Sequence, residues 1–495
     1  MNYIRIDLER ILGNVSRNIF GGFAEHLYRC IYGGIYEPGS PLADKYGFRT
    51  DVIAAIRSLQ MPVIRYPGGN FVSSYRWRDG IGPLKERPAR TDLAWSVMEP
   101  NHFGTNEFVR FCRELNAEPY LTVNCGDGDI REACDWVEYC NGTGDTALVQ
   151  LRRRHGFEEP HKVKYWSIGN EVDGSWQIGY KTPQEYARAF TEFGKAMRRI
   201  DPDIKLVAAT ISLWTGDIVE RTQLLLEQAS DLIDYLSLHW YVGNEKNDFA
   251  AYMTLSELFE ERLSACEGLI RAMRLSRGIR RHIAIAVDEW NVWYRTFPRD
   301  ISPTFTRIPN DGKEVYNLED ALVIAMNLNA FIRHAYSVGM ANLSEIVNVF
   351  APILTRPDGL VRQTIFYPFE LYSRTCGQAA IDVFWQGDTF AGGKYTGIRM
   401  LDVAATLNEQ QKQLVLYVVN RSQTEPMETM VSLYSGRFRG NVRAFVVNGP
   451  DIKAENTFET PNTVGTRESV INAEGESLNY TFEPHSVNAL VCSVS

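Results

Sequence analysis

Two glutamates stand at the ends of two apolar runs in the sequence. Glu171 follows Asn170 at the end of one run, and Glu289 follows Asp288 at the end of the other. If these runs are parallel strands of one barrel, their carboxyl ends open at the same rim, where such barrels hold their active sites. Two carboxyl groups at one rim suit glycoside hydrolysis, because one protonates the leaving oxygen while the other attacks the sugar carbon. Either glutamate alone would more often be a solvated loop charge, but the pair favours this chemistry.

Other polar side chains fall at the ends of neighbouring apolar runs. Arg65 would keep a nearby carboxylate ionised, His239 would exchange a proton with the acid, and Tyr241 would orient the nucleophile. Each of these three is about as easily explained by a structural ion pair or by packing in the barrel. Their clustering at predicted strand ends favours one shared site, which would also contain Glu25, Asn70 and Glu345.

Tryptophans are frequent near the same predicted rim, and aromatic residues make up 12% of the chain. Sugar rings have apolar faces that stack on aromatic side chains, although core packing is the more common role of a tryptophan. Trp95 and Trp293 lie in segments that follow predicted strands. We therefore predict that these two are exposed and contact a sugar.

Short apolar runs alternate with amphipathic segments between residues 19 and 380. The runs predicted as strands are Ile19–Ala24, Pro62–Tyr66, Pro119–Asn124, Val163–Gly169, Lys205–Thr210, Tyr235–Tyr241, Ile283–Glu289 and Leu343–Phe350. The clearest helical patterns are Asp51–Leu59, Asn106–Leu115, Pro183–Ile200, Ser256–Leu275 and Leu318–Val338. Eight nearly continuous apolar runs, each followed by a helical or mixed segment, are typical of an α/β fold of the (β/α)8 TIM barrel type.

The pattern changes after about residue 384, where short alternating strands are separated by Gly, Asn and Pro and no helix-length pattern appears. This pattern of short strands predicts a C-terminal β-sandwich. The strand-like start of the chain precedes the barrel and is predicted to join that sandwich. The predicted division is an N-terminal strand at 1–18, a catalytic barrel at 19–380 and a β-sandwich at 384–495.

Composition excludes several classes of partner. The 495 residues carry 52 Lys and Arg against 61 Asp and Glu, a net charge of −9 that argues against nucleic acid as a partner. No apolar stretch approaches the roughly 18–20 residues of a membrane span, and the first residues lack the apolar core of an export signal. The eight cysteines are scattered without a CxxC pair, so we expect reduced thiols and a cytoplasmic protein with no membrane partner.

Motifs of other chemistries are missing from the sequence. It contains no Walker phosphate loop, no dinucleotide GxGxxG, no HExxH and no GxSxG elbow. The eight histidines show no metal-ligand spacing. We therefore expect neither a cofactor nor a metal.

Several longer motifs resemble those of one family. They are Phe23-Ala-Glu-His-Leu27, Ile64-Arg-Tyr-Pro-Gly-Gly-Asn70, Lys164-Tyr-Trp-Ser-Ile-Gly-Asn-Glu171, Asp288-Glu-Trp-Asn291 and Val347-Asn-Val-Phe-Ala-Pro-Ile353. Together they resemble the α-L-arabinofuranosidases of glycoside hydrolase family fifty-one, in the family's order through most of the predicted barrel. In the predicted sandwich, only Glu483-Pro-His-Ser-Val487 is similar.

The resemblance implies a retaining barrel of glycoside hydrolase clan A with a β-sandwich, no cofactor, and a homo-oligomer, with a hexamer favoured. Carried over by motif, Glu171 would be the general acid/base and Glu289 the nucleophile, with Trp95 and Trp293 bordering the furanose or the leaving sugar. Asn170 would bind the sugar 2-hydroxyl. The residues lining the arabinose subsite would be Glu25, Arg65, Asn70, Asn170, His239 and Tyr241. The implied activity is exo-acting removal of terminal arabinofuranose from oligosaccharides derived from arabinoxylan or arabinan.

The sequence departs from the family's usual pattern at three places. Glu345 stands where the family usually has a glutamine, so it would add charge near the sugar and alter specificity or the catalytic pKa values. The stretches 98–102 and 124–129 also differ from the usual runs. Because these two stretches would border the leaving-group side, they bear on the leaving group more than on the reaction.

Two kinds of alternative function stay open at this point. One is another retaining glycosidase of the same clan, a β-xylosidase or an endo-β-glucanase. The other is a catalytically silent sugar-binding protein, because a fold does not fix a function. The presence of both Glu171 and Glu289 argues against the silent protein.

Overall fold

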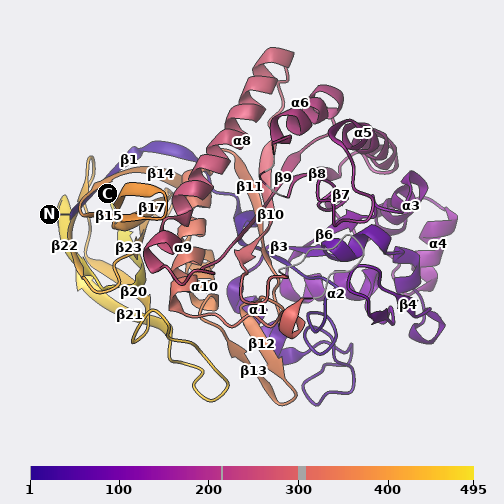
Figure 1. Cartoon of the computed structure of the whole chain (residues 1–495), viewed down its shortest axis with the longest axis horizontal. Helices are drawn as coiled ribbons and strands as arrows, with labels where there is room; N and C mark the ends of the chain where they lie inside the picture. Colours follow the sequence, from indigo (N-terminus) through magenta and orange to yellow (C-terminus); the bar gives the residue numbers. More distant parts are fainter. Residues whose placement is uncertain (1, 213, 215, 299–307) are drawn as a thin grey trace.

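Eight parallel strands close into a barrel that is ringed by helices (Figure 1). The computed structural model describes residues 2–212, 214, 216–298 and 308–495. Around the barrel the strands follow the order β10, β11, β2, β3, β6, β7, β8 and β9. Their bounds are β2 (Gly21–Phe23), β3 (Val63–Tyr66), β6 (Glu118–Val123), β7 (Tyr165–Ile168), β8 (Lys205–Ile211), β9 (Tyr235–Val242), β10 (Ala284–Val292) and β11 (Val338–Ser344).

Burial on both faces explains why these strands read as nearly continuous apolar runs. β3, β7 and β10 are buried along their whole length. The predicted fold class is confirmed, and the first seven predicted runs overlap observed strands. The eighth, Leu343–Phe350, is wrong, because β11 ends at Ser344. The residues after Ser344 are buried but irregular, and apolar character reports burial rather than strand geometry.

Helices cover the outside of the barrel, and α5 shows how local sequence defines one of them. The Thr182 side chain accepts from the backbone N–H of Glu185, and the Glu185 carboxylate accepts from the N–H of Thr182. Pro183 fills the first helical position, where its missing N–H costs nothing. The helices are α1 (Thr50–Leu59), α2 (Thr105–Leu115), α3 (Ile130–Asn141), α4 (Ala147–Arg154), α5 (Pro183–Ile200), α6 (Ile218–Ala229), α7 (Phe249–Met253), α8 (Leu255–Arg277), α9 (Leu318–Arg333) and α10 (Phe366–Thr375).

A second domain is built on a nine-stranded sheet in the order β21, β20, β23, β18, β17, β14, β1, β19 and β22. Strand β1 (Asn2–Asn14) brings the N-terminus into it, antiparallel to β14 and parallel to β19. The other strands are β14 (Ala379–Gln386), β17 (Leu401–Asn408), β18 (Gln413–Asn420), β19 (Met427–Leu433), β20 (Asn441–Asn448), β21 (Gly465–Asn472), β22 (Ser477–Phe482) and β23 (Ser486–Ser493). Short paired strands lie elsewhere, namely β4 (Arg90–Thr91) with β5 (Met98–Glu99), β12 (Ile353–Arg356) with β13 (Gly359–Arg362), and β15 (Thr389–Gly392) with β16 (Tyr395–Arg399).

The two domains meet along α9, which is buried almost throughout because it packs against both the barrel and the sheet. Figure 1 shows α9 and α10 between the barrel and the curled sheet at the left. The sheet domain has its own apolar core, to which Ile4 and Ile6 of β1 contribute. The division at 1–18, 19–380 and 384–495 stays a prediction, supported by this shared core. Within the described ranges, no helix is long and apolar enough to cross a membrane.

Candidate active site

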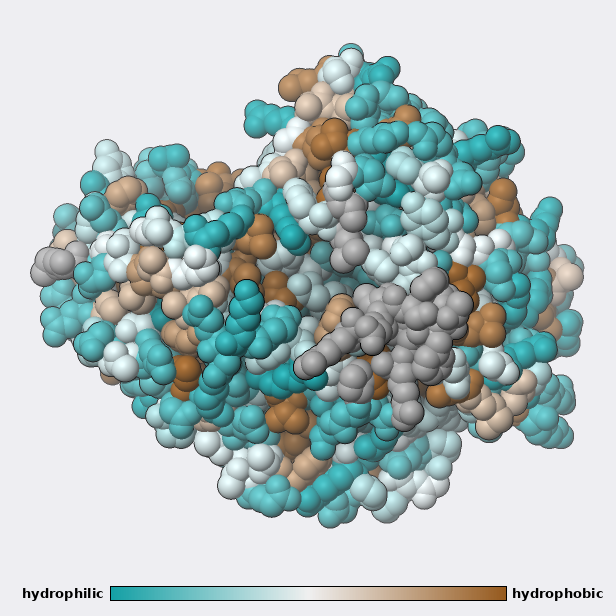
Figure 2. Space-filling model, viewed as in Figure 1, coloured by the Kyte–Doolittle hydropathy of each residue, from teal (hydrophilic) through white to brown (hydrophobic). Residues whose placement is uncertain are grey.

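A cavity of about 520 Å³ opens at the carboxyl ends of the barrel strands. Pockets that enclose small ligands generally measure about 300–1,000 Å³, so this one has room for more than a single sugar ring. Figure 2 shows the face that Figure 1 looks onto, where hydrophobic residues are scattered among hydrophilic ones. Of the residues predicted from sequence, those in the cavity wall are Glu25, Asn70, Trp95, Glu171, His239, Tyr241, Glu289 and Trp293.

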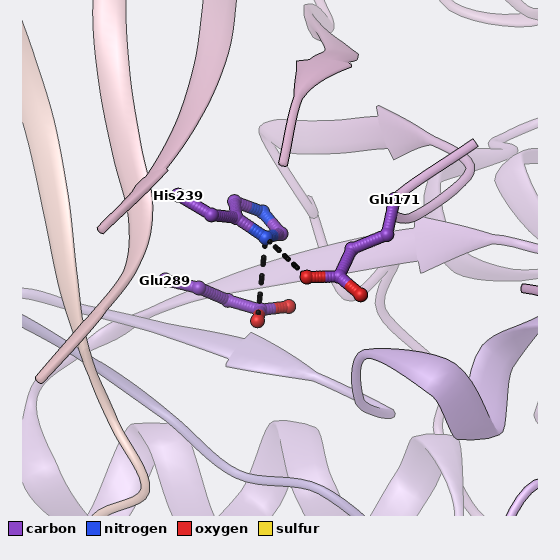
Figure 3. Close-up of side chains that lie close together, drawn as sticks. All are labelled: Glu171, His239 and Glu289. Atoms are coloured by element: carbon purple, nitrogen blue, oxygen red, sulfur yellow. Dashed lines mark hydrogen bonds and ion pairs between the residues drawn. The ribbon is translucent and has the colours of Figure 1, made fainter. Parts of the chain in front are cut away.

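The carboxylates of Glu171 and Glu289 lie side by side next to the ring of His239 (Figure 3). His239 Nδ1 is 3.0 Å from Glu171 Oε1 and 3.4 Å from Glu289 Oε2. One carboxylate oxygen of Glu171 lies within 4.8 Å of one carboxylate oxygen of Glu289. Retaining glycosidases hold their two carboxyl groups at about 5–5.5 Å, too close for a water molecule to attack from between them. The spacing therefore suits a double displacement through a covalent intermediate.

The chain leaves β7 through a turn that presents Glu171 to the cavity. Gly169 and Glu171 both adopt left-handed backbone conformations, with φ values of 82° and 43°. This region is uncommon for residues other than glycine and is often found at functional sites. Trp176 Nε1 donates to Glu171 Oε2 at 2.8 Å, which fixes the orientation of the carboxylate.

Glu289 is held by donors on two sides. Arg65 is fully buried and donates through Nη1 to Glu289 Oε1 at 2.8 Å, while Tyr241 donates through its hydroxyl to Glu289 Oε2 at 3.1 Å. Arg65 Nη2 also donates to Asn170 Oδ1 at 2.7 Å. The Asn170 amide nitrogen is buried just behind the cavity wall and has no hydrogen-bond partner in the described part of the chain. Arg65 thus couples the two strand ends.

Asp288 is a buried carboxylate that the sequence reasoning did not assign to the site. Tyr120 and Ser237 donate to it at 2.7 and 2.5 Å, and Arg65 Nε lies 3.7 Å away. Burial opposes its ionisation, but the charge of Arg65 and the hydrogen bond from His239 hold the pKa of Asp288 well below its usual range. Asp288 therefore balances the positive charge of Arg65 and His239 from beneath the cavity.

The proton of this cluster resides on the imidazole. Burial alone would lower the pKa of His239, but the charge of Glu289 and hydrogen bonds to Asp288 and Glu171 raise it to about 10. Burial opposes ionisation of Glu171, yet the hydrogen bond and charge of His239 bring its pKa below the usual value. Burial raises the pKa of Glu289, and the positive charges of His239 and Arg65 oppose that rise. These titrations are linked, because the His239 ring nitrogens lie 3.0–3.5 Å from the carboxylates of Glu171, Glu289 and Asp288.

Glu25 closes the inner end of the cavity. Its Oε1 accepts from the backbone N–H of Phe71 at 3.0 Å and from Trp95 Nε1 at 3.1 Å. Burial and the neighbouring charge of Glu289 raise the pKa of Glu25 to about 8. Gly68 makes this approach possible, since its φ of 149° suits glycine and an added Cβ would collide with the Glu25 side chain.

Two predictions about side-chain placement are corrected. Trp95 is not exposed; only 6% of its surface is accessible, because its indole hydrogen-bonds to Glu25, although it still lines the cavity. Glu345 is fully buried and lies behind Glu25, outside the cavity wall. Its Oε2 accepts from the Glu25 backbone N–H at 2.9 Å and from Cys30 Sγ at 3.3 Å, so it supports the wall.

Trp293 is half-buried and stacks on Phe350, with ring centroids 4.3 Å apart. Trp176, Ser344 and Phe350 line the cavity although the sequence reasoning did not include them in the site. Trp176 had a usable signal, because it lies five positions after Glu171, between the predicted strand Val163–Gly169 and the predicted helix Pro183–Ile200. Phe350 had none, since its position depends on an irregular segment.

Glu171, His239 and Glu289 are residue types that also ligate metal ions. Ligand atoms of Glu171, His239 and Glu289 lie within 4.8 Å of one another. A ligating imidazole must be neutral, however, and the charge of Glu289 with hydrogen bonds to Asp288 and Glu171 raises the pKa of His239 to about 10. The three residues therefore fit a proton-sharing cluster better than a metal site.

A (β/α)8 barrel with two closely spaced carboxylates at its carboxyl rim defines the class of glycoside hydrolases. Comparison with known proteins narrows the class. Residues 55–262 match the family description "Alpha-L-arabinofuranosidase 1 domain", and residues 288–486 match "Alpha-L-arabinofuranosidase C-terminal domain". The second match begins within β10 and extends into β23 of the sheet domain.

Relatives cover nearly the whole chain. The chain is 38% identical to alpha-L-arabinofuranosidase C of Emericella nidulans, over 98% of this chain and 96% of the relative. It is 37% identical to an intracellular exo-alpha-(1->5)-L-arabinofuranosidase of Halalkalibacterium halodurans, over 91% of each. The crystal structure of the Thermotoga maritima alpha-L-arabinofuranosidase, an arabinose complex, superposes with a TM-score of 0.90 at 37% identity over 99% of both chains. The chain belongs to the α-L-arabinofuranosidases of glycoside hydrolase family 51.

Proposed function

We propose that this arabinofuranosidase removes terminal α-L-arabinofuranosyl residues from oligosaccharides derived from arabinan or arabinoxylan, with retention of anomeric configuration. The observation that carries the retaining mechanism is the approach of Glu171 and Glu289 to within 4.8 Å. The exo mode rests on the closed inner end of the cavity, where Glu25 and Trp95 are buried. A cavity closed at its inner end admits only the terminal sugar of an oligosaccharide.

The two glutamates would divide the work by their surroundings. Glu289, held between Arg65 and Tyr241, attacks the anomeric carbon and forms the glycosyl-enzyme. Glu171 protonates the leaving oxygen with the proton that His239 holds 3.0 Å away. After the first product leaves, Glu171 takes a proton from a water molecule whose oxygen attacks the anomeric carbon, and the bond to Glu289 breaks to release arabinose.

The remaining predicted residues would bind the sugar. Asn170 offers its unpartnered amide N–H₂ to the 2-hydroxyl, a contact that strengthens in the transition state. Glu25 accepts hydroxyl donors at the inner end, and its raised pKa keeps it largely neutral below about pH 8. Asn70 and Trp293 supply a polar contact and an apolar wall.

Location and assembly belong to the same proposal. Bacterial relatives named as intracellular exo-arabinofuranosidases support a cytoplasmic site of action. We expect a homo-oligomer, with a hexamer favoured by family membership, and size-exclusion chromatography with light scattering tests the subunit number.

A panel of aryl glycosides tests the activity. We expect turnover of 4-nitrophenyl α-L-arabinofuranoside and no comparable turnover of the β-xyloside or β-glucoside. The Glu289→Ala variant serves as the control for contaminating activity. Preference for the β-xyloside or β-glucoside would favour the β-xylosidase or endo-β-glucanase alternative, and absence of any turnover would favour a silent sugar-binding protein.

A further inference from the structure

The cavity has a closed inner end and an open outer end that differ in chemistry. Glu25 and Trp95 at the inner end are buried, whereas Trp214 at the outer end exposes 39% of its surface and Phe297 exposes 37%. Arg262, which projects from α8, lines the same outer part. A substrate whose terminal sugar fills the inner end must place its next sugar among these outer residues.

The position of Glu171 decides which outer wall the next sugar contacts. Glu171 protonates the oxygen that leaves with that sugar, so the leaving group lies on the Glu171 side. On this side, Asp173 accepts hydrogen bonds from the backbone and hydroxyl of Ser212, which joins the turn after β7 to the segment after β8. Trp214 lies two residues beyond Ser212. Trp214 and Arg262 therefore form the wall beside the leaving group.

In the described part of the chain, the rings of Trp214 and Trp240 contact the Arg262 guanidinium. The guanidinium carbon lies 5.2 Å from the ring centroid of Trp214 and 4.9 Å from that of Trp240. Trp240 is itself stacked on Phe259 at 4.6 Å, so this support is rigid. Among the described residues, the Arg262 guanidinium has neither a carboxylate nor a carbonyl partner, and its Nε is buried without an acceptor. Burial lowers its pKa from the usual value.

Other buried arginines in the described part of the chain have oxygen acceptors, which for Arg152 are the backbone carbonyls of Tyr139 and Gly142. Arg333 binds Glu260 and Asp402, and Arg65 binds Glu289. A half-buried guanidinium without a protein acceptor must take its hydrogen bonds from solvent or from a ligand in the cavity. When an arginine stacks on an aromatic ring, its N–H groups point outward in the plane of the guanidinium and can still donate to oxygen acceptors.

We propose that Arg262 determines specificity for the leaving group, donating hydrogen bonds to the oxygens of a neutral sugar that stacks on Trp214. This inference rests on the proposed function and names the leaving-group contact of the same site. A neutral sugar is favoured over an acidic one, because Glu171, Glu245 and Glu289 already line the cavity and would repel a carboxylate on the substrate.

The test compares two substrates that share a terminal arabinofuranose but differ in the leaving group. These are α-1,5-linked arabinotriose, which leaves as a disaccharide, and 4-nitrophenyl α-L-arabinofuranoside, whose leaving group lacks sugar hydroxyls. For Arg262→Met we expect kcat/KM on arabinotriose to fall roughly 10–100-fold, the worth of one hydrogen bond to a charged group. The aryl substrate should change less than about twofold, since it offers no hydroxyl to the guanidinium.

Two further variants keep the result interpretable. Arg262→Lys retains a cationic donor and should recover part of the loss on arabinotriose. Arg271→Met removes an exposed arginine from the same helix, about 13 Å further along its axis, and should change neither substrate. Thermal unfolding of all three variants reports whether the fold is intact.

The outcomes distinguish a failure of the role of Arg262 from a failure of the proposed function. Equal losses on both substrates, or unchanged kinetics on arabinotriose, would overturn the role of Arg262 while leaving the proposed function standing. A folded wild-type protein that hydrolyses neither substrate would overturn the proposed function and this inference with it.

Discussion

His239 Nδ1 lies 3.0 Å from Glu171 Oε1, and the histidine is buried. Because the pKa of His239 is raised to about 10, the pair carries one proton over the whole neutral range. A general acid must hold a proton when substrate binds, and this arrangement keeps that proton one hydrogen bond away from the carboxylate that uses it.

Replacement of His239 by Gln should move the alkaline limb of the kcat/KM profile to lower pH. In the wild-type protein the shared proton leaves only as the pH approaches about 10, whereas in the variant Glu171 must hold it alone. We expect a shift of about one pH unit or more, because the cation that supplied the proton is gone. The measurement is kcat/KM against pH on the aryl arabinofuranoside, and an unshifted alkaline limb would count against the shared proton.

Glu171→Ala should discriminate between leaving groups. Loss of acid assistance is expected to slow hydrolysis of arabinotriose by about 10²–10⁴-fold. The loss on 4-nitrophenyl arabinofuranoside should be smaller, because nitrophenolate leaves without a proton. Steady-state kinetics on both substrates provide the check, and similar losses on both would remove Glu171 from the acid/base role.

Arg65→Met should lower both activity and stability. The substitution removes one of the two cations beside the buried carboxylates of Asp288 and Glu289, and breaking a buried ion pair typically costs about 3–5 kcal/mol of unfolding free energy. Urea unfolding followed by circular dichroism measures this cost. Arg78→Met is the matched control, since the Arg78–Asp135 pair is partly exposed and should contribute less than about 1 kcal/mol. Comparable stability of the two variants would show that Arg65 does not balance the buried charge.

His334 makes a second pH-dependent contribution, away from the active site. It lies 2.7 Å from Glu260 and 3.2 Å from Glu267, whose hydrogen bonds outweigh burial and raise the pKa of His334 to about 9. A raised pKa stabilises the fold fully below the unfolded pKa of about 6.5. That stabilisation is lost as the pH rises through about 9.

The variant His334→Gln tests this contribution. Its unfolding free energy should be lower than that of the wild-type protein by about 2 kcal/mol at pH 6, and the difference should shrink by pH 10. Urea unfolding at the two pH values measures both differences. A deficit that stays the same at pH 6 and pH 10 would mean that packing, rather than charge, is lost.

Sequence patterns correctly predicted those elements whose bounds depend on residues close together in the chain. The helix Pro183–Ile200 has the bounds expected from its cap and amphipathic face. The eighth strand was misplaced because the run Leu343–Phe350 is apolar for reasons of burial alone, whereas β11 (Val338–Ser344) contains a glycine and an asparagine that weaken its signal.

The residues of the candidate site also fall into those that the sequence could predict and those that it could not. Glu171 and Glu289 were found because strand ends converge in any barrel of this type. The position of Glu345 behind Glu25 could not be predicted, since it depends on the path of the chain after β11. Arg262 gave no local signal either, because its environment is made by Trp214 and Trp240, which are distant in sequence.

The double displacement at Glu289 can be observed by mass spectrometry of the Glu171→Ala variant after brief reaction with 4-nitrophenyl α-L-arabinofuranoside. Without the acid/base, formation of the glycosyl-enzyme should outpace its hydrolysis, so the intermediate accumulates. We expect one arabinosyl group on the peptide that contains Glu289, and none when Glu289 is also replaced by Ala. An adduct on another residue, or product formed with inverted configuration, would contradict this mechanism.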